Sequence, residues 1–152
     1  MSLMSGAEYI DSLRKLNPNL YISGQKVANF VEHPLVRPAI NVVAKAYDMA
    51  LDPQFSDLFT VKSHLTGEVT NRFLHVYQDQ DDCLQALRML RASNAAVGTC
   101  IIRCVNKEVI NPLWETTYQT DRAHGTDYHE RFKSFLALLQ RNDEWCAAGI
   151  TD

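Results

Sequence analysis

The chain has 152 residues and a formal net charge of −3, from 15 Lys and Arg against 18 Asp and Glu. Hydrophobic residues make up 46% and charged residues 22%, which excludes an intrinsically disordered chain and suits a domain with its own core. The sequence has neither an apolar run of about 18 residues nor a secretory leader, and its acidic balance argues against nucleic acid as the main partner. We therefore expect a cytoplasmic protein that binds neither membranes nor nucleic acid.

The first third of the chain predicts two helices. Ser5 and Glu8 are three residues apart, as in a capping box, and the apolar stripe that follows them ends at residues 17–19. Pro38 suits the first turn of a helix. The helical apolar spacing after it predicts a second helix, which Asp52-Pro53 ends.

The middle of the chain predicts an extended segment and then a long helix. In residues 58–77, apolar residues flank a Thr66-Gly67 turn signal, so extended chain or a loose hairpin is expected. The acidic cluster at 79–82 favours a helix start. Helical spacing then continues over residues 81–105, which predicts a single helix of about 25 residues.

The last third predicts two more helices. Pro112 is expected to begin the first of them. Asp127 and Glu130 have the spacing of a second capping box, and an apolar stripe that includes Phe135 follows them. The tail, residues 146–152, carries no such stripe.

Together these elements predict a mainly α fold with a short extended or hairpin segment near 58–77. We assign residues 5–152 to a single helical domain. Residues 1–4 contain a second possible start and are interpreted as a tag or start remnant.

The segment Cys100-Ile101-Ile102-Arg103-Cys104 has the clearest chemical content. Without a secretory signal, reduced thiols or metal ligands are expected rather than disulfides. On a continuous helix, residues four apart have Cβ atoms about 5–6 Å apart, too far for a disulfide but suited to two thiolates on one metal centre, such as an iron–sulfur cluster. Arg103 could favour the thiolate form. We predict that Cys100 and Cys104 lie one turn apart on one helix and are not disulfide-bonded.

Two other interpretations of this segment remain open. The cysteines could simply be buried in a helix core, since free cysteine is among the most buried residue types. Alternatively, Cys100 and Cys104 together with His124 and His129 have the loose spacing of a zinc site. The isolated histidines are expected to be polar packing residues: His33, His64 and His75.

Several blocks along the chain match one family in the right order. They cover residues 9–17, 33–41, 52–58, 62–73, 116–121 and 125–129, with motifs such as Asp52-Pro53-Gln54-Phe55 and Thr116-Thr117-Tyr118. On these blocks the chain resembles the 4-hydroxyphenylacetate 3-hydroxylase flavoprotein family. Within that family it resembles the N-terminal region of the 4-hydroxybutyryl-CoA dehydratase/vinylacetyl-CoA delta-isomerase branch.

The resemblance implies an acyl-CoA-dehydrogenase-like fold of which this chain is the helical N-terminal domain. It implies FAD and a 4Fe-4S cluster in the full-length enzyme, with Cys100 and Cys104 as two cluster ligands. Arg91 matches an arginine near the family's active site, and we take it, with Arg103, as electrostatic support for catalysis. The implied reaction removes water from 4-hydroxybutyryl-CoA and yields crotonyl-CoA. The branch carries Gln where this chain has Ile102.

The resemblance also implies partners, and alternative functions are considered beside it. The remaining cluster ligands, a His and a Cys, are expected in further polypeptide, so the 152-residue chain alone should bind no cofactor and be inactive. The expected partners are the rest of the polypeptide, an acyl-CoA substrate and other copies in a homotetramer. The alternative functions are a reduced-flavin-dependent aromatic hydroxylase and a non-enzymatic helical interaction module.

Overall fold

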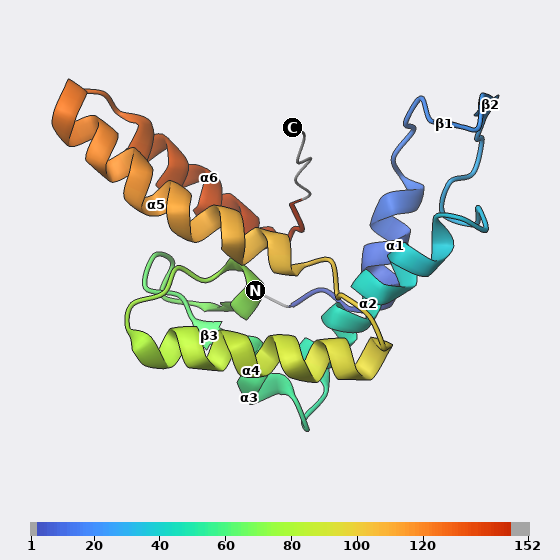
Figure 1. Ribbon diagram of the computed structural model, residues 1–152, viewed down its shortest axis with the longest axis horizontal. Coiled ribbons are helices and arrows are strands. Elements are labelled where there is room, and N and C mark those ends of the chain that lie inside the picture. The colour runs from blue at the N-terminus through green and yellow to red at the C-terminus, as the bar shows by residue number, and fades with distance from the viewer. Residues whose placement is uncertain (1–2, 147–152) are drawn as a thin grey trace.

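The structure, a computed structural model that describes residues 3–146, is mainly helical, as the sequence predicts (Figure 1). In chain order, its elements are α1 (Gly6–Arg14), β1 (Tyr21–Ile22), β2 (Gln25–Lys26), α2 (Arg37–Leu51), α3 (Ser56–Phe59), β3 (Thr60–Lys62), β4 (Val69–Asn71), the 3-10 helix η1 (Arg72–Leu74), α4 (Gln80–Val97), α5 (Cys104–His124) and α6 (Tyr128–Asn142). Helices α1 and α2 pack together on one side, and α5 and α6 form a pair on the other (Figure 1). Helix α4 runs across the lower half of the view, with α3 below it (Figure 1).

Helix α1 begins with the predicted capping box. The Ser5 hydroxyl accepts a hydrogen bond from the Glu8 backbone N–H at 3.2 Å, and the Glu8 carboxylate accepts one from the Ser5 N–H at 2.8 Å. The Gly6 N–H donates to the Asp48 carboxylate on α2 at 2.8 Å. A Cβ atom at Gly6 would lie 2.6 Å from the Ala44 carbonyl oxygen. The glycine therefore lets the start of α1 touch the backbone of α2.

Replacing Gly6 by Ala should destabilise the fold, because the added methyl group would meet the backbone carbonyl of Ala44 as well as the Asp48 carboxylate. We expect a loss of about 1–3 kcal/mol, typical of overpacking, measured as a lower midpoint in urea unfolding. Ala7→Ser, at the exposed neighbouring position, is the control and should leave the midpoint almost unchanged. An unchanged midpoint for Gly6→Ala would contradict the close approach of α1 and α2.

The second helix and the hairpin follow the predictions closely. Helix α2 has Pro38 in its first turn and ends at Leu51, with Asp52 as C-cap. Strands β3 and β4 pair antiparallel within residues 58–77, and Gly67 has a φ of 74° in the turn between them. The hairpin β1–β2, with two residues in each strand, and the single-turn helix α3 were not predicted, because such short elements show no hydrophobic period.

The prediction of one helix over residues 81–105 is wrong. Helix α4 starts at Gln80, where the Asp79 side chain caps it, but it ends at Gly98 in the left-handed conformation, with φ 68°. A glycine in this conformation is a common helix terminator, since it has no Cβ atom to clash. The predicted start at Pro112 is also wrong, because Pro112 lies inside α5, which begins at Cys104.

The second predicted capping box is wrong as well. Asp127 precedes α6 but makes no capping hydrogen bond. The cap comes instead from Asp121 near the end of α5, whose carboxylate accepts hydrogen bonds from the N–H groups of Tyr128 at 2.9 Å and His129 at 2.8 Å. Burial opposes ionisation, but these bonds and one from Thr126 lower the pKa of the Asp121 carboxyl.

Asp121→Ala should therefore destabilise the α5–α6 pair more than Asp127→Ala, which serves as the matched control. The order would reverse if the capping box read from the sequence were correct. Because the folded-state pKa of Asp121 is lowered, its contribution is present above the unfolded value of about 3.9 and is lost as pH falls through the folded value. Thermal unfolding from pH 7 to pH 3 should show the two variants converging at the acidic end.

The core consists of three contiguous clusters of buried side chains. The first joins α2, α3, η1, α4 and the loop before α5, and includes Met49, Phe73, Met89 and Ile101. The second lies between α1 and α2. The third joins η1, α5 and α6. The loop between α4 and α5 contributes to the first two clusters, because Ile102 packs against the second.

Some sequence predictions concern surfaces or residues at the ends. Phe135, placed on the apolar stripe of α6, is 51% exposed, so this stripe is not wholly core.

No helix within residues 3–146 is long and apolar enough to span a membrane. Of the predicted tail, only Cys146 belongs to the described residues, and residues 1–2 of the predicted remnant also lie outside them. Leu3 and Met4 pack against the core.

Candidate functional site

The thiols of Cys100 and Cys104 lie side by side in the connection between α4 and α5. Their Sγ atoms are 3.5 Å apart. Cys100 is exposed in the connecting loop, and Cys104, partly buried, is the first residue of α5. The prediction that both lie on one helix is therefore wrong, because Gly98 ends α4 before Cys100 is reached. The predicted absence of a disulfide between them is confirmed, since both are free.

The backbone between the cysteines has an unusual conformation. Ile102 has a φ of 67°, in the left-handed region that β-branched residues rarely adopt. This conformation directs the Ile102 N–H toward the Cys100 Sγ, at 3.4 Å, and its carbonyl oxygen lies 3.9 Å from the Cys104 Sγ. The loop thus brings one backbone N–H donor to the sulfur pair.

Burial raises the pKa of the Cys104 thiol, and its hydrogen bond with the neighbouring Cys100 raises that pKa further. The positive charge of Lys107, one turn along α5, acts in the opposite direction. Lys107 is 7% exposed and is paired with the Glu108 carboxylate. The pair therefore consists of an exposed thiol, Cys100, and a partly buried thiol, Cys104, whose pKa is raised above its ordinary value.

This difference should appear in alkylation by iodoacetamide, which reacts with the thiolate. At pH 8 we expect Cys100 to be modified well before Cys104, and the Cys104 rate to keep rising beyond pH 9. Peptide mass spectrometry over time would measure both rates, with exposed Cys83 as the reference thiol in the same molecule. Equal rates at Cys100 and Cys104 would contradict the arrangement.

The structure places the two arginines of the predicted site in different surroundings. Arg91 is exposed on α4. Arg103 is fully buried, with its guanidinium carbon 4.0 Å from the ring centroid of Tyr47 and 5.1 Å from that of Phe73. One of its nitrogens lies 3.6 Å from the Asp143 carboxylate. Its guanidinium is therefore held within the core.

Asp143, which sequence reasoning missed, is fixed from several sides. Its carboxylate accepts a hydrogen bond from the Met4 N–H at 3.0 Å, and its carbonyl accepts one from the Tyr47 hydroxyl at 2.9 Å. Burial raises the pKa of the Asp143 carboxyl, against the lowering effect of the Arg103 charge. Burial also raises the pKa of Tyr47 to about 12. No local sequence pattern indicates that Asp143 contacts Met4, Tyr47 or Arg103, because these residues lie far from it along the chain.

The zinc interpretation is wrong. Cys104 begins α5 and His124 ends it, and a helix of this length separates its ends by about 30 Å. His129 lies instead against Trp114, with ring centroids 4.7 Å apart, and its Nδ1 is 3.0 Å from the Thr117 hydroxyl. Within residues 3–146, no group of three or more His, Cys, Asp or Glu residues is placed to hold a metal ion.

The polar packing predicted for the isolated histidines is confirmed most clearly at His75. This residue is 2% exposed, and its Nε2 lies 2.9 Å from the Asp82 carboxylate. His64 packs edge-on against His75 and Trp114.

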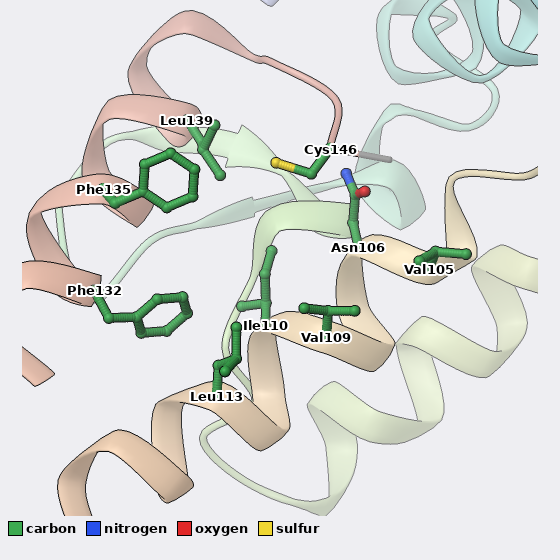
Figure 2. A pocket seen from close by; sticks show the side chains of 9 residues that line it. All are labelled: Val105, Asn106, Val109, Ile110, Leu113, Phe132, Phe135, Leu139 and Cys146. Atoms are coloured by element: carbon green, nitrogen blue, oxygen red, sulfur yellow. The ribbon is translucent and has the colours of Figure 1, made fainter. Parts of the chain in front are cut away.

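A second feature is an apolar pocket of about 250 Å³ between α5 and α6 (Figure 2). Its wall is formed mainly by apolar side chains: Val105, Val109, Ile110, Leu113, Phe132, Phe135, Leu139 and Cys146. The Asn106 amide also lines it, although Asn106 is only 1% exposed. Asn106 and Cys104 are two residues apart on α5, so they face roughly opposite sides of the helix. The pocket is therefore separate from the thiol pair.

Comparison with known proteins connects the chain to one family. Residues 5–152 match the family model described as 4-hydroxyphenylacetate 3-hydroxylase N terminal. The chain is 42% identical over 150 residues to the 4-hydroxybutyryl-CoA dehydratase/vinylacetyl-CoA-Delta-isomerase of Clostridium aminobutyricum, covering 99% of this chain and 31% of that relative. The chain thus spans about a third of the relative's length.

Solved structures of two proteins are also similar to this chain. An oxygen-tolerant archaeal 4-hydroxybutyryl-CoA dehydratase from N. maritimus superposes with a TM-score of 0.89 at 39% identity, over 93% of this chain and 28% of that one. The oxygenase component of 4-hydroxyphenylacetate 3-monooxygenase complexed with FAD superposes with a TM-score of 0.65 at 18% identity, over 92% of this chain and 28% of that one. The second likeness is one of fold.

Proposed function

The chain belongs to the 4-hydroxyphenylacetate 3-hydroxylase N-terminal family, and from this premise we propose that it is the N-terminal helical domain of a 4-hydroxybutyryl-CoA dehydratase/vinylacetyl-CoA delta-isomerase. The observation that carries the proposal is the thiol pair, with Sγ atoms 3.5 Å apart, in a chain 42% identical to such an enzyme. The finer assignment of an acyl-CoA-dehydrogenase-like fold belongs to this proposal.

The thiol pair fits the donor set that an iron–sulfur cluster requires. Such clusters are held by cysteine thiolates, sometimes with histidine. Cys100 is exposed, so the pair opens to the surface, and the Ile102 N–H already points at one sulfur. We propose Cys100 and Cys104 as two of the cluster ligands, with the other two in further polypeptide. When bound, the cluster and FAD supply Lewis-acid and redox chemistry for the dehydration.

This chain's own residues have a defined part in that function. To bind metal, both thiols must lose their protons. Burial and the neighbouring thiol raise the pKa of the Cys104 thiol, and the Lys107 charge acts against them. The loop holds the two sulfurs toward one centre. Arg91, exposed on α4, and the buried Arg103 remain our proposed electrostatic support for catalysis beside the cluster site.

The partners proposed are the rest of the polypeptide, the acyl-CoA substrate and further copies of the enzyme. The exposed apolar side chains of α5 and α6 give such contacts a surface, because large exposed apolar patches tend to mark interfaces. They include Val109, Leu113, Phe135 and Leu138. A reduced-flavin aromatic hydroxylase, the rival within the family, has no evident use for the thiol pair.

The test is iron, flavin and turnover analysis of the full-length enzyme. We expect FAD, iron and conversion of 4-hydroxybutyryl-CoA, with Cys100→Ser and Cys104→Ser each losing iron and activity. Cys83→Ser, at an exposed cysteine on α4, is the matched control and should retain both. Hydroxylation of a phenol with reduced flavin would identify the hydroxylase instead, and absence of both flavin and turnover would favour an interaction module.

The 152-residue chain alone should hold no stable cluster and show no turnover, because two thiols supply only half of a four-ligand site. Iron analysis after anaerobic reconstitution, followed by exposure to air, would measure this. Retention of a full cluster by the isolated chain would show that the other ligands lie within it.

A further inference from the structure

We propose that the buried Arg103–Asp143 pair is a positioning device that sets the separation of the Cys100 and Cys104 sulfurs before a metal centre binds. The proposal rests on the proposed function only in that the thiols are taken to hold one centre together. Arg103 is a positioning residue here, since it acts through the backbone of the loop.

The first observation is that the side chains of the three residues between the cysteines all pack into the protein. Ile101 is fully buried in the first core cluster, and its N–H donates to the Asn94 side chain on α4 at 3.0 Å. Ile102 packs against the second cluster, between α1 and α2. Arg103 is fully buried over Tyr47. The loop is thus held at three successive side chains, and the cysteines flank this anchored segment.

The second observation is that Asp143 is itself immobilised. Met4 donates to its carboxylate and Tyr47 to its carbonyl, so contacts from two other segments hold it. Asp143 also has a positive φ of 49°, at the end of α6. A guanidinium held between this carboxylate and the Tyr47 ring has little freedom. Because Arg103 directly precedes Cys104, that restriction passes to the second sulfur.

The third observation is that the arrangement is costly. Within the described residues, no nitrogen of the Arg103 guanidinium makes a hydrogen bond, and the Asp143 Oδ1 has no hydrogen-bond donor. Removing two charges from water can cost more than their attraction returns, so such a pair is a poor source of stability. The left-handed Ile102 adds backbone strain in the same loop. Cost and strain concentrated beside two thiols favour a positioning role over a stabilising one.

The test uses phenylarsine oxide, a trivalent arsenical that forms two As–S bonds to a thiol pair and releases one water. The background is the 152-residue chain with Cys83→Ser and Cys146→Ala, so that only the pair reacts. The variant is Arg103→Met with Asp143→Asn, which removes both charges together and leaves neither buried alone. Asparagine also tolerates the positive φ of position 143.

We expect the double variant to keep its unfolding midpoint but to bind the arsenical roughly tenfold more weakly, because preorganisation of the pair is lost. The alkylation rate of Cys100 by iodoacetamide, which needs one thiol, should not change. Arg88→Met, at an exposed arginine on α4, is the matched control and should leave arsenical binding unchanged. A folded double variant with unaltered arsenical affinity would overturn the proposal.

Arg103→Lys gives a second comparison if the double variant does not fold. It keeps the charge but loses the planar contact with Tyr47, so weaker arsenical binding and faster hydrogen exchange at the Ile102 N–H are expected, and no change in either would overturn the proposal. None of these measurements uses iron or turnover. Failure of the dehydratase assignment therefore stays distinguishable from failure of the positioning role.

Discussion

The burial of Arg103 beside Asp143 is the constraint on which the arrangement of the candidate site depends. This contact joins the start of α5 to the end of α6 and, through Tyr47 and the Met4 N–H, to α2 and the segment before α1. A buried charge with an opposite charge beside it tolerates little displacement, since separating the two leaves each uncompensated. The loop that carries the cysteines is therefore part of the rigid core, although Cys100 itself is exposed.

Local signals explain why much of the fold could be predicted from the sequence. The Ser5–Glu8 capping box, the turn at Gly67 and the end of α2 at Asp52 each depend on residues within one turn or hairpin. The prediction of one long helix failed at Gly98. The apolar spacing continues beyond this residue, although a glycine is itself a common helix terminator. Asp121 was missed because it caps a different helix from its own.

Only part of the candidate site could be predicted from the sequence, because the rest depends on contacts between residues far apart in the chain. The spacing of Cys100 and Cys104 drew attention to a thiol pair, and the thiols do lie together. Their backbone could not be predicted, because Ile102 is held in a conformation contrary to its own preference. Nor does any local pattern indicate that Arg103 is buried, since an arginine is normally exposed and its partner Asp143 lies far along the chain.

The hydrogen bond from Met4 to Asp143 spans 139 residues and the one from Tyr47 to Asp143 spans 96. Contacts of this sequence separation form only after the intervening chain has been made, and domains fold as units during synthesis. During translation, α4 and α5 are therefore synthesised before Asp143, the buried partner of Arg103. The contacts that fix the loop of the thiol pair are therefore complete only after α6 has been made and has packed on the rest of the domain.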